Sequence, residues 1–212
     1  MKSSVQRPVT LLILTTSLVG LLSACVPVLM GGAMMGTALV VTDRRTSGAQ
    51  LEDQGIELRA ANRIHENLGD RVHVSVTSYN RRALITGEVP SAQDKQLVEQ
   101  IVSRVDNVQA VVNELAVLGN STLTQRSSDS LVSGRIKAGM VDAKDLFANA
   151  FKVVTERGVT HLMGRVTQRE ADRATEIART TQGVQKVVKV FEIISEDELR
   201  NMLPKPAQPT QN

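Results

Sequence analysis

Apolar and polar residues recur with two alternating periods along most of this 212-residue chain. Four apolar residues first recur at helical spacing: Leu58, Ala61, Ile64 and Leu68. Three valines then alternate with polar residues, as in a strand with one buried face: Val72, Val74 and Val76. Residues 80–82 predict a turn, 83–89 a second strand and 108–117 a third. Between the last two strands, a helix is predicted by another apolar stripe: Leu97, Ile101, Val102 and Val105.

The same order of elements returns later in the chain. Helices are predicted over 130–141 and 169–180, and strands over 150–155, 159–166 and 184–194. The segment Gly87-Glu88-Val89 aligns with Gly164-Arg165-Val166, and "NVQAVVN" from Asn107 aligns with "GVQKVVK" from Gly183. Each copy also carries a capping-box pattern, in which a hydroxyl precedes an acidic residue by three positions: Ser91 with Asp94, and Thr167 with Glu170. This agreement in caps, core and turns indicates an internal duplication.

A long apolar run from Val9 to Leu22 follows two basic residues and precedes small ones, which is the layout of an export signal. The segment Leu22-Ser23-Ala24-Cys25 holds the only cysteine and resembles the lipobox of bacterial lipoproteins. The resemblance implies that residues 1–24 are a cleaved signal peptide and that Cys25 carries a covalent diacylglycerol and an N-acyl chain. The alternative is that Cys25 is a buried small hydrophobe.

The residue after the cysteine indicates to which membrane the chain is attached. Val26 is not the aspartate that commonly retains such lipoproteins in the inner membrane, so the resemblance favours the periplasmic face of the outer membrane. Several acyl chains hold a protein on a membrane without a spanning helix. Residues 25–50 are predicted to be a flexible, apolar and Gly-rich tether; the alternative for residues 26–41 is a glycine-spaced segment for self-association.

Charge and composition exclude several classes of function. Removing Lys2 and Arg7 with the signal lowers the formal net charge of +3 by two, to +1, and the chain has no Trp, one Tyr and three Phe. Neither a dense basic footprint nor a set of stacking aromatics is present, so nucleic acid is not an expected partner. The three histidines are isolated in the sequence, and no catalytic or metal-binding motif occurs. We expect no enzyme, no metal and no cofactor beyond the acyl chains.

Two tandem units, in which Gly87 and Gly164 close the second strand before a capped helix, resemble paired BON domains. The resemblance extends through the segment "FKVVTERGVTHLMGRVTQREADRATEIA" of the second unit. It implies an α+β fold of two αββαβ domains, each a small three-stranded mixed sheet with two helices packed on it. The expected boundaries are 51–118 and 129–195 for the domains, 119–128 for a linker, and 196–212 for a C-terminal tail that is disordered at its end.

Together with the lipobox, this resemblance implies an outer-membrane lipoprotein that binds anionic phospholipid through its second BON domain. It also implies a role in outer-membrane integrity, recruitment to the division site, and work near the outer-membrane protein assembly machinery. A protein-binding adaptor for that machinery or for the septum, using the same surface, is the alternative. An unrecognised enzyme would need a pocket with perturbed titratable groups.

The first helix of the second unit carries the candidate lipid-binding residues. Val132, Ile136 and Met140 form the stripe expected to pack on the sheet. A second stripe with a basic rim is expected to face anionic headgroups: Leu131, Gly134, Arg135, Lys137, Ala138 and Val141. The alternative is that Leu131 and Val141 pack against the first domain or the linker. The first unit's helix is expected to offer no such apolar ridge.

Gly87 and Gly164 are expected to be structural. Each follows a strand and precedes a helix cap, where a special backbone conformation or a close backbone approach favours glycine. A direct lipid role is the alternative, and neither belongs to a G-x-G-x-x-G phosphate loop.

Overall fold

The computed structural model describes residues 43–202, which lie within one compact unit, Val41–Asn212. The predicted signal peptide, Cys25, the tether up to residue 42 and the end of the tail lie outside the described residues. All three described hydrophobic clusters fall within residues 43–202, so this unit contains its own core.

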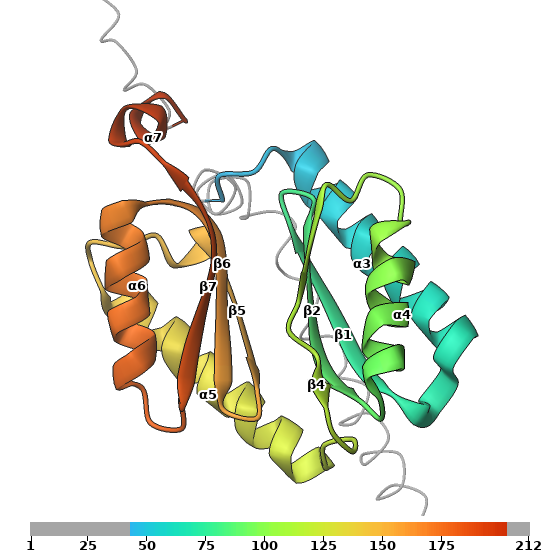
Figure 1. Ribbon diagram of the computed structural model, residues 1–212. Helices are drawn as coiled ribbons and strands as arrows, with labels where there is room; N and C mark the ends of the chain where they lie inside the picture. Colours follow the sequence, from blue (N-terminus) through green and yellow to red (C-terminus); the bar gives the residue numbers. More distant parts are fainter. Residues whose placement is uncertain (1–42, 203–212) are drawn as a thin grey trace, which may run out of the picture. The chain divides into compact units, whose positions relative to one another are not determined.

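The first domain consists of two helices packed on one face of a mixed sheet (Figure 1). Its elements are α3 (Ser47–Leu68), a 3-10 turn η2 (Gly69–Arg71), β1 (His73–Tyr79), β2 (Arg82–Val89), α4 (Ala92–Ser103), β3 (Ala110–Asn113) and β4 (Ala116–Val117). Strand β1 pairs antiparallel with β2, and both β3 and β4 run parallel to β2. The predicted third strand over 108–117 is therefore interrupted between β3 and β4.

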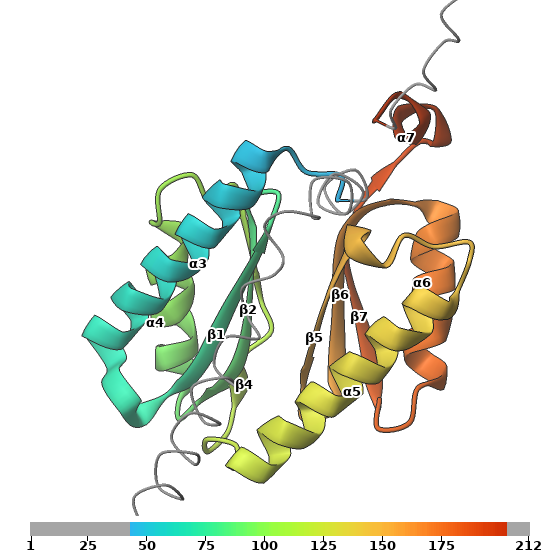
Figure 2. The ribbon, with the colours of Figure 1, turned by 180° about the vertical axis from the view of Figure 1, so that it is seen from behind.

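The second domain repeats this arrangement (Figure 2). Its elements are α5 (Leu123–Asp142), η3 (Ala148–Ala150), β5 (Phe151–Glu156), β6 (Val159–Thr167), α6 (Gln168–Thr180) and β7 (Lys186–Ile194), followed by α7 (Glu196–Met202). The sheet order is β5-β6-β7, with β5 antiparallel and β7 parallel to β6. The predicted α+β class with two helix-covered mixed sheets is confirmed. Helix α7, at the start of the predicted tail, was not predicted.

The buried stripe of α3 differs from the predicted one. The residues that enter the core follow an i, i+4 rule: Ile56, Ala60, Ile64 and Leu68. Leu58 and Ala61 are instead exposed, because Leu58 lies on the opposite side of the helix from this stripe and Ala61 lies at its flank. Leu51 is exposed as well, so α3 carries two exposed leucines, while the absence of a ridge like that of the second unit stays a prediction.

Helix α5 begins at Leu123, well before the predicted start at residue 130. Thr122 accepts a hydrogen bond from the backbone N–H of Gln125, and the Gln125 side chain accepts one from the backbone N–H of Thr122. This capping box lies inside the predicted linker 119–128 and converts its second half into helix. Its Thr-x-x-Gln pattern is present in the sequence, but the surrounding serines give the segment the composition of a linker.

Each domain has its own core between helices and sheet, and a third cluster joins the two domains. Tyr79 and Leu84 of the first sheet are buried with Met163 and Val190 of the second. These residues lie on the sheet faces that the helices do not cover. The open faces of the two sheets therefore cover each other.

Both glycines that close the second strands lie against backbone carbonyls. Gly87 has φ 112°, and a Cβ there would lie 2.0 Å from the carbonyl oxygen of His73. A Cβ on Gly164 would lie 2.6 Å from the carbonyl oxygen of Ala150. A side chain at either position would collide with the neighbouring strand.

Candidate functional site

Helix α5 separates a buried stripe from an exposed one, as its sequence predicts. Val132, Ile136 and Met140 are buried in the core of the second domain. The opposite side, hereafter the α5 face, is exposed: Leu123, Leu131, Gly134, Ala138 and Val141. Leu131 is 62% exposed and does not pack against the first domain. The added member, Leu123, belongs to the helical turn that the sequence reading assigned to the linker.

Lys137 does not belong to the basic rim of this face. Its Nζ donates hydrogen bonds of 2.7 Å to the carbonyl oxygen of Ala148 and 2.6 Å to that of Phe151. Burial lowers the pKa of Lys137, and a weaker attraction to Asp43 opposes this effect. The prediction of Lys137 as a rim cation is therefore corrected: the side chain folds inward and ties α5 to the start of β5.

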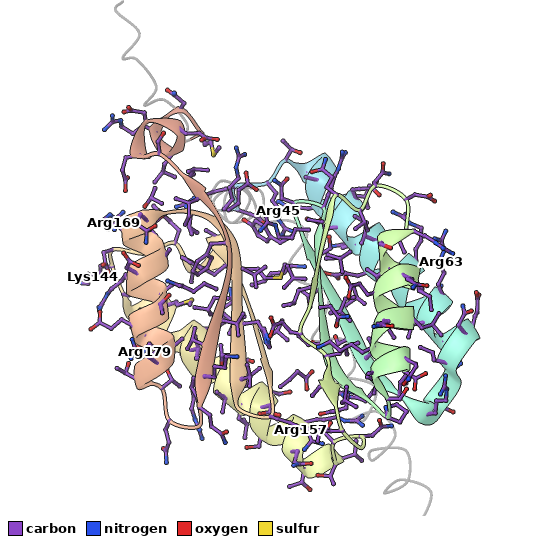
Figure 3. All side chains as sticks on the ribbon, viewed as in Figure 1. Arg45, Arg63, Lys144, Arg157, Arg169 and Arg179 are labelled. Atoms are coloured by element: carbon purple, nitrogen blue, oxygen red, sulfur yellow. The ribbon has the colours of Figure 1, made fainter. Side chains whose placement is uncertain are left out.

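Arg135 is the basic side chain that remains beside the α5 face. It is exposed and forms no ion pair within residues 43–202. Lys144, labelled in Figure 3, is exposed just beyond the end of α5, while Asp142 adds one exposed carboxylate near Val141. The face is thus an apolar stripe with a modest basic border.

A buried aspartate on α5 fixes the hairpin turn beside it. Asp129 accepts hydrogen bonds of 2.8 Å from the backbone N–H of Arg157 and 3.0 Å from that of Gly158. Both turn residues have positive φ, 48° and 75°, as in a type I′ turn. These bonds hold α5 in register with the β5–β6 hairpin.

In the first domain, too, a buried helix aspartate binds the backbone of a hairpin turn. Asp53 on α3 accepts hydrogen bonds from the backbone N–H groups of Asn80 and Arg81, each 2.8 Å, and from the Ser78 hydroxyl at 2.6 Å. Burial opposes ionisation of Asp53, but the bonds from Ser78 and Arg81 outweigh it and lower its pKa. Sequence reasoning missed both aspartates, although each occupies the same place in its repeat.

A polar cluster joins the two domains at the end of β2. Glu88, 1% exposed, accepts a hydrogen bond of 2.7 Å from Arg157 Nε and bonds of 3.2 and 3.0 Å from the backbone N–H and hydroxyl of Ser121. His73 Nδ1 lies 2.9 Å from Glu88 Oε2. Burial opposes ionisation of Glu88, but the bonds from Arg157, His73 and Ser121 outweigh it and lower its pKa.

A second tie lies at the N-terminal end of the described residues. Arg44 donates to both carboxylate oxygens of Glu170 on α6, and Arg45 donates to Asp53 on α3 at 2.8 Å. Figure 3 shows Arg45 and Arg157 toward opposite ends of the strands. The structure thus departs from the predicted tether over residues 43–50, because buried ion pairs hold 43–45 and α3 begins at Ser47.

Within residues 43–202, every helix is too short or too polar to cross a bilayer.

Comparison with protein-family models agrees with this architecture. The family model described as "BON domain" matches residues 52–119 and 128–195. The outer membrane lipoprotein DolP of Haemophilus influenzae is 34% identical over 175 residues, covering 82% of this chain and 90% of that protein. The 21 kDa hemolysin of Actinobacillus pleuropneumoniae is 29% identical over 154 residues, covering 72% of this chain and 79% of that one. The C-terminal domain of CdsD from Chlamydia trachomatis is 13% identical, with a TM-score of 0.28 over 63% of this chain and 96% of that one.

The chain belongs to the BON-domain family and contains two BON domains. It is an outer-membrane lipoprotein similar to DolP. Proteins of this kind are in general not enzymes.

Proposed function

We propose that this lipoprotein binds anionic phospholipid through the α5 face and thereby supports the integrity of the outer membrane. The carrying observation is the exposure of Leu131 and its apolar neighbours on a helix whose other side is fully used by the core. Gly134 has no side chain and Ala138 only a methyl group, so the helix axis can approach the headgroup region closely. Arg135 supplies attraction to negative charge.

The α5 face contributes a modest binding free energy, which adds to that of the predicted acyl anchor. Burying a leucine completely is worth about 1.5–3 kcal/mol, so inserting the exposed part of Leu131 supplies about 1–2 kcal/mol. One basic residue near an anionic surface adds about 1 kcal/mol. Acylation of Cys25, which is part of this proposal, would keep the face near the bilayer at high effective concentration and make weak binding sufficient.

The test compares two leucines of equal exposure in the chain from Val41 onward, which lacks the predicted anchor and retains the described cores. Leu131→Glu on α5 and Leu58→Glu on α3 alter side chains that are 62% and 64% exposed. Flotation with anionic vesicles should be weakened at least about tenfold by the first substitution, the equivalent of 1.4 kcal/mol. The second substitution should leave binding unchanged. Zwitterionic vesicles should bind weakly.

The lipid proposal would be wrong if the two variants bound anionic vesicles equally well, or if the wild type did not bind anionic vesicles. Indifference to vesicles would favour the α5 face as the docking site for a protein of the assembly or division machinery. The proposal also includes recruitment of this lipoprotein to the division site. Imaging of the full-length Leu131→Glu variant in dividing cells tests whether this recruitment depends on the α5 face.

A further inference from the structure

We infer that His73, Glu88 and Glu156 form a binding site for a divalent transition-metal ion at the junction of the two BON domains. One ligand atom from each of these residues lies within 4.8 Å of the other two. His73 and Glu88 are directly opposite each other on β1 and β2, and Glu156 ends β5 of the second domain. The ion would therefore bind both domains at once.

The three side chains are held in place by different elements. Glu88 is fixed by Arg157, which donates to its Oε1, and by Ser121 in the segment between the domains, whose backbone N–H and hydroxyl donate to Oε2, the oxygen that also faces His73. Glu156 precedes the turn that Asp129 locks through two backbone N–H groups. Such outer contacts orient ligating carboxylates in metal sites. The ligand atoms lie within 4.8 Å of one another, and movement of the side chains would bring them to bonding distance of one ion.

The Glu156 carboxylate is available as a ligand, because it forms no hydrogen bond or ion pair within residues 43–202. The His73 side chain is partly exposed, which provides a path of entry. In a tetrahedral zinc site, bonds of about 2.0–2.1 Å place ligand atoms about 3.3 Å apart. The 2.9 Å between His73 Nδ1 and Glu88 Oε2 requires only a small opening.

The donor set selects the class of ion. An imidazole nitrogen with two carboxylate oxygens suits zinc and related transition metals, whereas calcium takes six to eight oxygens and magnesium keeps most of its water. Any proton on the ligating nitrogen of His73 leaves when the ion binds, since a ligating imidazole nitrogen must be unprotonated. A fourth position would be taken by water.

The test is calorimetric titration of the full-length, tag-free protein in detergent with Zn²⁺, and with Mg²⁺ as the hard-ion probe. The site variants are His73→Gln and Glu156→Gln. The matched controls are His65→Gln and Glu66→Gln, which alter exposed residues of α3. Cys25 is present in all of these proteins and cannot account for a difference among them.

Wild type and controls should bind one Zn²⁺ per chain, and each site variant should bind at least about tenfold more weakly. Co²⁺ should give the visible absorption of a low-coordinate site in the wild type, and lose it in both site variants. Failure of the wild type to bind one Zn²⁺, equal affinity of site and control variants, or displacement of Zn²⁺ by equimolar Mg²⁺ would each overturn the inference. His73→Gln provides the answer if Glu156→Gln does not fold.

Discussion

Arg44 and Glu170 form a bidentate ion pair, with distances of 2.7 and 2.6 Å, whose side chains are 4% and 0% exposed. The guanidinium also donates to the carbonyl oxygen of Arg165 at 2.9 Å. Glu170 Oε2, which accepts from Arg44, also accepts a hydrogen bond from the backbone N–H of Thr167 and completes the capping box of α6. One carboxylate thus caps a helix of the second domain and holds the segment that precedes the first.

Removal of Arg44 should be strongly destabilising. Arg44→Ala leaves the buried Glu170 carboxylate without its cation, and losing one partner of a buried ion pair costs about 3–5 kcal/mol. Urea unfolding of the chain from Val41 onward measures the change. Arg200→Ala, in an exposed pair with Asp197, is the control and should change little, because exposed ion pairs contribute little. Equal, small effects of both substitutions would contradict a structural role for Arg44.

Acid should destabilise the fold through three buried carboxylates. Burial opposes ionisation of Glu170, but Arg44 and the backbone of Thr167 outweigh it and lower its pKa, as their own partners do for Asp53 and Glu88. A carboxyl group with a lowered folded-state pKa stabilises the fold above its unfolded pKa and loses that contribution as the pH falls through the folded value.

The free energy of unfolding should therefore decline as the pH falls below the ordinary carboxyl values of 3.8 for Asp and 4.5 for Glu. Urea midpoints measured across this range test the expectation. Glu170→Gln should be less stable at neutral pH and show a shallower decline, because it has one fewer group to titrate. A stability curve that is flat in acid, or equally steep in both proteins, would disagree.

The two basic residues predicted for the rim should behave differently. Arg135→Gln removes an exposed charge and should weaken binding to anionic vesicles by several-fold, since each such charge is worth about 1 kcal/mol, with no change in stability. Lys137→Gln leaves the carbonyl groups of Ala148 and Phe151 with a poorer donor and should lower stability. Flotation and urea unfolding of both variants separate the two effects. The assignment fails if Lys137→Gln weakens vesicle binding as much as Arg135→Gln at unchanged stability.

Gly134 offers a stabilising substitution within the α5 face. A Cβ at this position meets no neighbouring atom within 4 Å, and the residue lies inside a helix. Gly134→Ala should therefore raise stability by about 1 kcal/mol through helix propensity. Thermal unfolding gives the result. Gly87→Ala is the contrasting variant, because its new Cβ would collide with the backbone of β1, and it should be destabilised instead.

The sequence was most informative where a local pattern determines structure. The capped helices after Ser91 and Thr167 and the inward stripe of α5 follow from short-range rules, and the structure contains them. Exposure of Leu131 and Val141 follows from the same helical spacing, while their contact with lipid stays a prediction.

Long-range contacts account for what the sequence could not supply. Lys137 has the sequence position of a rim residue, yet carbonyl groups more than ten residues away draw it inward. Arg44 resembles a solvated linker charge until Glu170, 126 residues later, is brought beside it. Asp53 and Asp129 could have been found, because an acidic residue at the same place in both repeats, on the inward side of a helix, calls for a buried donor.

The mutual packing of Tyr79, Leu84, Met163 and Val190 has a consequence for how a duplicated chain of this kind can be divided. Each domain expressed by itself would turn an uncovered apolar sheet face to water, and such a face invites aggregation. The two copies are therefore no longer interchangeable modules. Loss of one copy would expose the apolar sheet face of the other to water, which favours inheritance of the two copies as a pair.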